Sequence, residues 1–179
     1  MIPALRRCRL VATDVDGVLT RGTVALDAEG RRMGFFSARD GMGVTVALHA
    51  GLEIALVSGA RSAALRARAR ELGIRHVLDG VRDKRMAVGG LLGMLGIAPE
   101  EALFVGDDLN DLQAFAAVGI RVAVADAAPE LRARADWVTE RRGGEGALRE
   151  VVEGVLRVQE RWESVVHELF DMPAAPGGS

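Results

Sequence analysis

The sequence predicts an α/β protein built on a doubly wound parallel sheet of the Rossmann-like type. Short apolar runs alternate with longer amphipathic segments along its 179 residues, which is the pattern of parallel strands joined by crossover helices. Clusters of polar residues follow several of the apolar runs, and ligands of such sheets bind beyond the carboxyl ends of the strands. Because this length suits one domain, we expect residues 1–179 to fold as a single unit.

Strands are predicted where apolar residues follow one another between turn residues. These runs are 10–13, 54–57, 76–78, 102–105 and 120–124. Residues 23–26 and 33–36 flank a turn-forming segment at 27–30, which predicts a β-hairpin after the first strand.

Helices are predicted from apolar periodicity together with capping residues. Their ranges are 40–49, 62–72, 84–95, 109–117, a short helix from 129 and a long amphipathic helix within 146–170. Asp40 and Ser62 are the expected N-caps, and Gly73 and Gly96 are expected to end their helices. The Pro-, Ala- and Gly-rich stretch from about 171 to 179 is expected to be a mobile tail.

The composition narrows the class of protein. A hydrophobic fraction of 49% with 27% charged residues excludes a disordered chain. The net charge of −2 argues against a nucleic-acid partner. A single cysteine, Cys8, excludes a disulfide framework and a Cys-rich zinc site. The sequence holds no run of 18 apolar residues and no signal peptide, so we expect no membrane partner and a cytoplasmic location.

Acidic residues gather after the predicted strands. They are Asp14 and Asp16 after the first strand, and Asp107, Asp108 and Asp111 after the fourth. Carboxylates that are packed together repel one another, and a divalent cation relieves this repulsion. Mg²⁺ is the natural choice, because it prefers hard oxygen ligands and no His/Cys cluster competes for zinc.

Two further groups at these strand and helix ends suit a phosphoryl group. Ser58 follows the second strand, and Lys84 begins a helix and is the only lysine among 23 basic residues. Phosphoryl oxygens need such cationic and hydrogen-bonding partners. A carboxylate nucleophile can form an aspartyl-phosphate, while a second carboxylate protonates the leaving oxygen and then activates water. The residues therefore favour hydrolysis of a phosphate monoester.

The segments that carry these groups resemble the four motifs of the haloacid dehalogenase superfamily. Residues 14–20 (Asp-Val-Asp-Gly-Val-Leu-Thr), Ser58, Lys84 and residues 106–111 (Gly-Asp-Asp-Leu-Asn-Asp) match them in order. A closer resemblance, to the 3-deoxy-D-manno-octulosonate 8-phosphate phosphatases, extends over segments 39–41, 57–59, 122–127 and 143–150. The resemblance implies a phosphatase of a keto-deoxy sugar acid phosphate that uses Mg²⁺.

The resemblance also implies a role for each site residue. Asp14 would be the nucleophile and Asp16 the general acid/base. Asp14, the backbone carbonyl of Asp16, and Asp107 would hold Mg²⁺. Asp108 and Asp111 would support these ligands without binding the ion themselves. Ser58 and Lys84 would bind the phosphoryl oxygens. The residues expected near the sugar are Asp16, Arg39, Asp40, Gly41 and Arg68.

Members of that family lack a separate cap domain, and a hairpin takes its place, here at about 20–37. The resemblance implies a homotetramer in which neighbouring subunits cover the open site. Val24, Leu26, Phe35 and Phe36 of the hairpin are candidates for that contact. The alternative is that these side chains fold back onto their own core.

The identity of the substrate stays open at this point, because family members often carry Arg where this chain has Ala60, followed by Arg61. A nine-carbon keto-deoxy sugar acid 9-phosphate is the alternative substrate. Two non-enzymatic alternatives are a phosphoacceptor domain and a catalytically inactive regulatory relative. The position of Asp16, two residues after Asp14, favours hydrolysis over the phosphoacceptor.

Overall fold

The computed structural model describes residues 3–171 and confirms the predicted doubly wound α/β fold. A six-stranded, fully parallel sheet has the order β5-β4-β1-β6-β7-β8. Its strands are β1 (Leu10–Thr13), β4 (Glu53–Ser58), β5 (His76–Asp79), β6 (Ala102–Gly106), β7 (Ile120–Ala123) and β8 (Trp137–Val138). The predicted mobile tail lies outside the described residues, except for Asp171.

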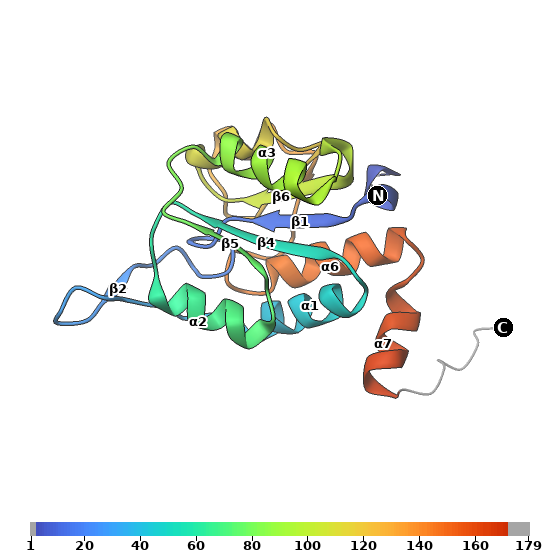
Figure 1. The fold of residues 1–179 in the computed structure, drawn as a ribbon, viewed down its shortest axis with the longest axis horizontal. Helices are drawn as coiled ribbons and strands as arrows, with labels where there is room; N and C mark the ends of the chain where they lie inside the picture. The colour runs from blue at the N-terminus through green and yellow to red at the C-terminus, as the bar shows by residue number, and fades with distance from the viewer. Residues whose placement is uncertain (1–2, 172–179) are drawn as a thin grey trace.

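Helices cover both faces of the sheet (Figure 1). On one face lie α1 (Ala38–His49), α2 (Ala63–Leu72) and α6 (Ala147–Val158), and on the other lies α3 (Lys84–Leu95). The remaining helices are α4 (Leu112–Phe115), α5 (Pro129–Arg132) and α7 (Trp162–Phe170). Of these, α4 contacts α3. Short 3₁₀ segments at Pro3–Arg7, Pro99–Glu101 and Leu109–Asp111 complete the described elements. None of the helices within residues 3–171 has the length and apolarity needed to cross a membrane.

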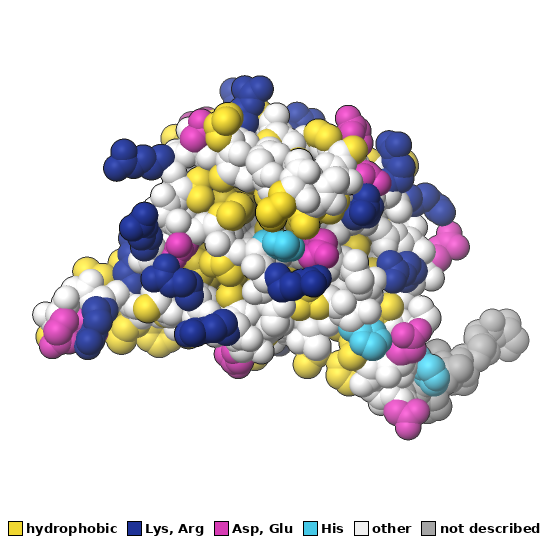
Figure 2. All heavy atoms as spheres, viewed as in Figure 1, with side chains coloured by type: hydrophobic (Ala, Val, Ile, Leu, Met, Phe, Trp, Pro, Cys, Tyr) yellow, Lys and Arg dark blue, Asp and Glu magenta, His cyan; other side chains and the backbone are white. Residues whose placement is uncertain are grey.

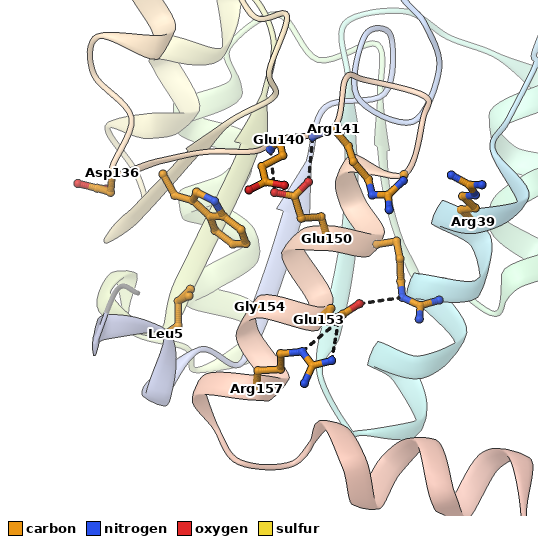
Figure 3. A pocket seen from close by; sticks show the side chains of 12 residues that line it. Leu5, Arg39, Asp136, Glu140, Arg141, Glu150, Glu153, Gly154 and Arg157 are labelled. Carbon is orange, nitrogen blue, oxygen red and sulfur yellow. Dashed lines mark hydrogen bonds and ion pairs between the residues drawn. The ribbon is translucent and has the colours of Figure 1, made fainter. Parts of the chain in front are cut away.

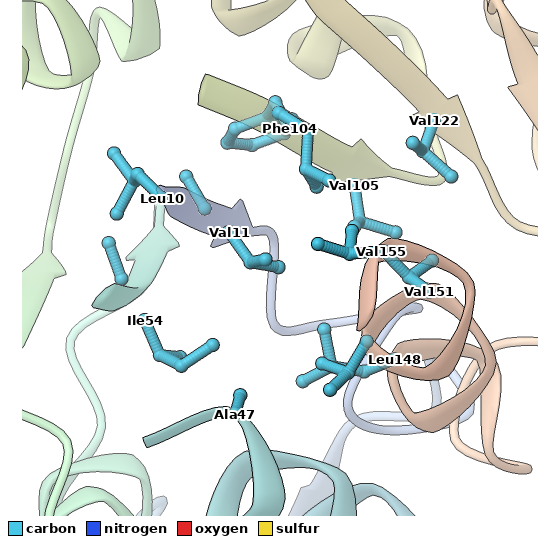
Figure 4. Packing of buried hydrophobic residues seen from close by; sticks show 14 of the residues in the cluster. Leu10, Val11, Ala47, Ile54, Phe104, Val105, Val122, Leu148, Val151 and Val155 are labelled. Carbon is cyan, nitrogen blue, oxygen red and sulfur yellow. The ribbon is translucent and has the colours of Figure 1, made fainter. Parts of the chain in front are cut away.

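The core lies between the central strands and the helices of each face (Figure 4). Val11 of β1 and Val151 and Val155 of α6 are fully buried there, and Phe104 of β6 packs edge-on against Phe115 of α4. A fully buried side chain of this kind contributes about 1.5–3 kcal/mol relative to an exposed one. Because the central strands are buried on both faces, they are apolar without alternation, which is why they were recognisable in the sequence.

The helix ends agree with the sequence in some places and not in others. Ser62 caps α2 and Gly73 ends it at φ 73°, as predicted. The prediction that Asp40 caps the first helix was wrong, because α1 begins two residues earlier and Ser37 accepts a hydrogen bond from the amide of Asp40. The predicted helix over 109–117 is a 3₁₀ turn followed by the short α4.

The long helix predicted within 146–170 is two helices, α6 and α7. Glu160 between them adopts φ 59°, which breaks the helical path. The side chain of Gln159 donates hydrogen bonds to the carbonyls of Leu5 and Cys8, and Arg161 donates to the carbonyl of Ala50. Contacts with distant backbone therefore fix the break, and a local pattern in the sequence does not reveal them.

The predicted hairpin is present, with shorter strands than expected. It consists of β2 (Ala25–Leu26) and β3 (Arg32–Met33), and it projects from the body of the molecule in Figure 1. Leu26 is 56% exposed and Phe35 is 75% exposed, and Val24 and Met33 are also exposed. Hydrophobic side chains are correspondingly visible on this projection in Figure 2. Only Phe36 of the predicted contact residues packs partly against the core.

Candidate active site

The parallel order of the sheet brings three loops to one edge. β1 lies between β4 and β6, with Thr13 paired to Leu56 on one side and to Val105 on the other. Asp14 follows β1 directly, and its amide donates to the carbonyl of Val105 at 2.9 Å. The segments after β1, β4 and β6 therefore meet at the carboxyl edge of the sheet, as the sequence predicted.

The loop after β1 depends on a glycine. Gly17 adopts φ 110°, which favours glycine, and a Cβ at this position would overlap the carboxylate of Asp107. Thr20 closes the loop, because its hydroxyl accepts from the amide of Gly17 and donates to the carbonyl of Val15. The glycine thus lets the carboxylate of Asp107 approach the backbone next to Asp14 and Asp16.

A buried ion-pair network joins the loops. Lys84 is 2% exposed, and its Nζ donates to Oδ1 of Asp14 at 2.5 Å and to Oδ1 of Asp111 at 2.6 Å. Asp14 and Asp111 are also buried. The only lysine of the chain is therefore a buried partner of two predicted site residues, not a surface residue.

Asp111 holds the loop after β6 as well as Lys84. Its Oδ2 accepts hydrogen bonds from the amides of Asp107 and Asp108 at 2.9 and 3.4 Å. The Asp108 carboxylate accepts from the amide of Leu109 and so caps the 3₁₀ turn. Asp108 and Asp111 therefore lie behind Asp107 and orient its loop.

The charges of the network do not balance. Burial, together with the charge of Asp111, raises the pKa of Asp14 to about 7. Burial and the charges of Asp14 and Asp111 raise the pKa of Asp107 to about 8. Burial by itself lowers the pKa of Lys84, but attraction by Asp14 and Asp111 outweighs it, and the net shift is upward. One ammonium therefore does not compensate three carboxylates.

The donor set fits a divalent cation. Ligand oxygens of Asp14, Asp107 and Asp111 all lie within 4.8 Å of one another. Within residues 3–171, the carboxylate of Asp107 has no hydrogen-bond or ion-pair partner. Both oxygens of Asp111 are engaged, Oδ1 by Lys84 and Oδ2 by two amides, whereas Asp14 binds Lys84 through Oδ1 alone. Clustered carboxylate oxygens are the ligands that Mg²⁺ prefers. Asp14 and Asp107 are thus the carboxylates best placed to bind it.

A cavity of about 480 Å³ opens between this edge and the hairpin. Asp16 and Ser58 line it, together with Arg21, Arg32 and Phe35. Ser58 is buried, and its hydroxyl accepts from the amide of Ala60 at 3.1 Å. This cavity can take a substrate whose anionic end reaches Ser58 and Asp14 and whose body lies against the hairpin.

Arg32 of β3 is a cavity residue that was not among the predicted site residues. Its Nη1 lies 3.3 Å from Oδ2 of Asp16, and both side chains are partly exposed to the cavity. No local signal in the sequence marks it, because the neighbouring Arg31, directly before β3, is the same type of residue and yet pairs with Asp27 and Glu29.

Of the residues predicted near the sugar, Asp16 lines the cavity, whereas Arg39, Asp40, Gly41 and Arg68 do not. Arg39 borders a second cavity of about 840 Å³ beside α6 and does not line the one with Asp16 (Figure 3). Asp40 is buried, and its two oxygens accept from the amides of Gly146 and Arg149 at 3.1 and 3.0 Å. A Cβ at Gly41 would overlap the guanidinium of Arg68, which pairs with Glu71.

The structure therefore separates this second group from the carboxylate site. Asp40 fixes the start of α6, and Gly41 leaves room for Arg68 between α1 and α2. A substrate contact by any of them stays a prediction. The nucleophile, acid/base and phosphoryl-binding predictions concern residues that the structure brings to one edge of the sheet.

The chain is similar to known proteins of one family. A sequence model described as haloacid dehalogenase-like hydrolase matches residues 50–150. The chain is 40% identical over 155 residues to a 3-deoxy-D-manno-octulosonate 8-phosphate phosphatase from Yersinia pestis, covering 87% of this chain and 83% of that protein. It is 42% identical over 159 residues to the phosphatase of the same name from Escherichia coli (strain K12), covering 89% and 85%.

Solved structures share the fold over nearly the whole chain. One is the 3-deoxy-D-manno-octulosonate 8-phosphate phosphatase of Moraxella catarrhalis in complex with a magnesium ion, a phosphate ion and a KDO molecule. It has a TM-score of 0.89 at 35% identity, and the match covers 93% of this chain and 95% of that one. A cobalt-bound phosphatase from Haemophilus influenzae has a TM-score of 0.88 at 37% identity, with coverage of 94% and 96%.

Proposed function

The chain belongs to the haloacid dehalogenase-like hydrolases, and from this premise we propose that it is a magnesium-dependent phosphatase of 3-deoxy-D-manno-octulosonate 8-phosphate. The observation that carries the proposal is the pairing of Lys84 with Asp14 beside the carboxylate of Asp107. This arrangement combines a nucleophile, a cation for phosphoryl oxygens and a place for Mg²⁺ within one buried network. The relatives with this activity and the magnesium- and KDO-bound neighbour support the same substrate class.

In the first half-reaction, a carboxylate oxygen of Asp14 attacks the phosphorus atom. The bond from phosphorus to the ester oxygen breaks, and the carboxyl proton of Asp16 passes to that leaving oxygen. Asp16 suits this role because its side chain is partly exposed to the cavity, where the sugar would lie. Ser58 and Lys84 donate hydrogen bonds to the phosphoryl oxygens.

In the second half-reaction, Asp16 takes a proton from a water molecule whose oxygen attacks the phosphorus atom. The bond between phosphorus and Asp14 breaks, which releases inorganic phosphate and restores both carboxyl groups to their starting states. Asp14, the backbone carbonyl of Asp16 and Asp107 would hold Mg²⁺. When bound, the ion supplies the positive charge that keeps Asp14 ionised and offsets the charge of the phosphoryl oxygens. Asp108 and Asp111 keep Asp107 in place through the loop that they cap.

We infer further that the protein is a homotetramer in which the hairpin contacts neighbouring subunits. The exposed Val24, Leu26, Met33 and Phe35 support this inference, since they leave the hairpin apolar and outside the core. Such a contact would also narrow the open cavity over Asp16. The cytoplasmic location expected from the sequence stays a prediction.

The test is a phosphate-release assay with purified protein and Mg²⁺. The substrates are the eight-carbon keto-deoxy sugar acid 8-phosphate, the nine-carbon 9-phosphate, and simple sugar phosphates. We expect the eight-carbon ester to have the highest kcat/KM. Preference for the nine-carbon ester would reassign the substrate, and equally poor turnover of both would count against either assignment. If no phosphate is released from any ester, the proposed function is wrong and a regulatory role gains support.

A further inference from the structure

Among the described residues, one polar contact joins the hairpin to the rest of the chain, and it involves the proposed acid/base Asp16. Residues 23–36 form hydrogen bonds and ion pairs among themselves, as between Asp27 and Arg31. Within the described chain, the pair between Arg32 and Asp16 is the only one that leaves this segment. Besides the packing of Phe36 against the core, the polar connection between the hairpin and the rest of the described chain is therefore at the proposed acid/base.

The local charges make this pair specific. The neighbouring cation, Arg31, lies directly before β3 and forms exposed ion pairs with Asp27 and Glu29. Arg21, the other arginine lining the cavity, pairs with Glu145. Arg32 is thus the guanidinium available to Asp16, and Asp16 has no other hydrogen-bond or ion-pair partner among residues 3–171.

The exposure of the pair decides what it can do. The side chains of Arg32 and Asp16 are 36% and 42% exposed, so this ion pair contributes little to stability. A guanidinium has a fixed fork of donors, which restricts the orientation of a carboxylate that it binds. The pair therefore suits the orientation of a carboxylate in the cavity better than the anchoring of a strand.

We propose that Arg32 is a positioning residue, which holds the carboxyl group of Asp16 toward the leaving oxygen. This proposal rests on the proposed phosphatase function. It gives the hairpin a second task besides covering the site, because the segment that replaces a cap also sets the geometry of proton transfer. A misplacement of about 1 Å at a reacting group can cost about 10²-fold in rate.

The test compares leaving groups. An alkyl phosphate such as a sugar phosphate needs a proton on its leaving oxygen, whereas p-nitrophenyl phosphate leaves as a stabilised anion and needs none. The kcat/KM for p-nitrophenyl phosphate reports steps only through the first half-reaction. The activation of water by Asp16 in the second half-reaction therefore does not affect this value. We expect Arg32→Ala to lower kcat/KM for the sugar phosphate by about 10- to 100-fold and to change the value for p-nitrophenyl phosphate by less than about 3-fold.

Three controls make the result decisive. Arg31→Ala removes a neighbouring hairpin cation and should leave both values unchanged. Arg32→Lys keeps a cation but lacks the fork of donors, and it should recover only part of the sugar-phosphate activity. In the Asp16→Asn background, Arg32→Ala should have no further effect, because the two residues act as one unit.

Equal losses on both substrates, or no loss on either, would overturn the proposal and leave the pair a simple tether. A wild-type protein that hydrolyses no phosphate ester at all would instead overturn the proposed function, and the role of Arg32 would fall with it. If the wild type prefers another sugar phosphate, that ester takes the place of the eight-carbon one in the same comparison.

Discussion

The ammonium nitrogen of Lys84 lies 2.5 Å from Oδ1 of Asp14, although 70 residues separate the two in the chain. Both are buried, and the ring of Phe104 lies 5.8 Å below the ammonium. A single buried cation in contact with Asp14 and Asp111, with Asp107 close by, leaves the site short of positive charge. The pair is thus half of a site that a divalent cation and a phosphoryl group would complete.

The two aspartates after β1 are expected to separate by role. Asp14→Asn should abolish phosphate release, since the amide is not a nucleophile, and Asp16→Asn should lower kcat by about 10²- to 10⁴-fold. Both variants should keep the fold, because each replacement has nearly the same shape. Phosphate release and thermal unfolding of the same preparations measure this. Full turnover by Asp16→Asn would remove Asp16 from its proposed role.

The metal-free protein should lose stability as the pH rises. The pKa of Asp107 in the folded state is about 8, well above its ordinary value. A carboxyl group with a raised pKa stabilises the fold while protonated, and this contribution is lost as the pH rises through the folded-state pKa. Lys84, whose pKa is also raised, stays charged throughout this range. In EDTA, the melting temperature of the wild type should fall relative to that of Asp107→Asn between about pH 4 and pH 8.

If the melting temperatures of the two proteins change with pH in the same way over that range, the pKa of Asp107 is not raised in the folded protein. Glu100→Gln, on an exposed 3₁₀ turn, serves as the control for the loss of one negative charge. Its melting temperature should follow that of the wild type.

Magnesium should reverse this loss. Mg²⁺ binds ionised carboxylates, so its effect on stability grows as Asp14 and Asp107 lose their protons. The rise in melting temperature on adding Mg²⁺ should be larger at pH 8 than at pH 5.5. The rise should shrink in Asp107→Asn and remain in Glu100→Gln. A shift that is the same at both pH values, or unaffected by Asp107→Asn, would place the ion elsewhere.

The sequence was informative where function depends on position along a strand or helix. Asp14 follows β1, Ser58 ends β4 and Lys84 begins α3, so the parallel order of the sheet brings them to one edge without further information. The ends of α2 and α3 were predictable for a similar reason, because Ser62, Gly73 and Gly96 act on the adjacent backbone.

The sequence was uninformative where a side chain meets a distant partner. Asp40 binds amides that lie 106 and 109 residues away, and the same acidic residue near a helix start looked like a cap. Arg32 and Arg31 are adjacent arginines, and only the direction of the hairpin decides which of them reaches Asp16. The break between α6 and α7 depends on the carbonyls that Gln159 and Arg161 find in other elements.

The hairpin is expected to hold the assembly together. Leu26 and Phe35 contact little of their own chain, so Leu26→Asp and Phe35→Asp together should lower the oligomeric state without lowering the stability of the subunit. Light scattering after gel filtration measures the mass. Met94→Asp alters a side chain that is 71% exposed on α3 and should leave the mass unchanged. An unchanged mass for the hairpin variant would exclude these side chains from the interface.

Asp40 distinguishes a structural role from the substrate contact that the sequence suggested. Its carboxylate accepts from the amides of Gly146 and Arg149, and these bonds oppose the rise in its pKa that burial causes. Asp40→Ala leaves both amides without a partner and should lower the free energy of unfolding by about 1–3 kcal/mol. Asp40→Asn keeps one acceptor oxygen and should lower the free energy of unfolding by less. Urea unfolding of both variants measures this, alongside kcat/KM for the sugar phosphate and for p-nitrophenyl phosphate.

A structural role of Asp40 predicts a larger loss of stability for Asp40→Ala than for Asp40→Asn, with similar effects on the kcat/KM of the two substrates. An undiminished stability with a selective loss on the sugar phosphate would instead place Asp40 at the substrate, and would require the start of α6 to move when the substrate binds.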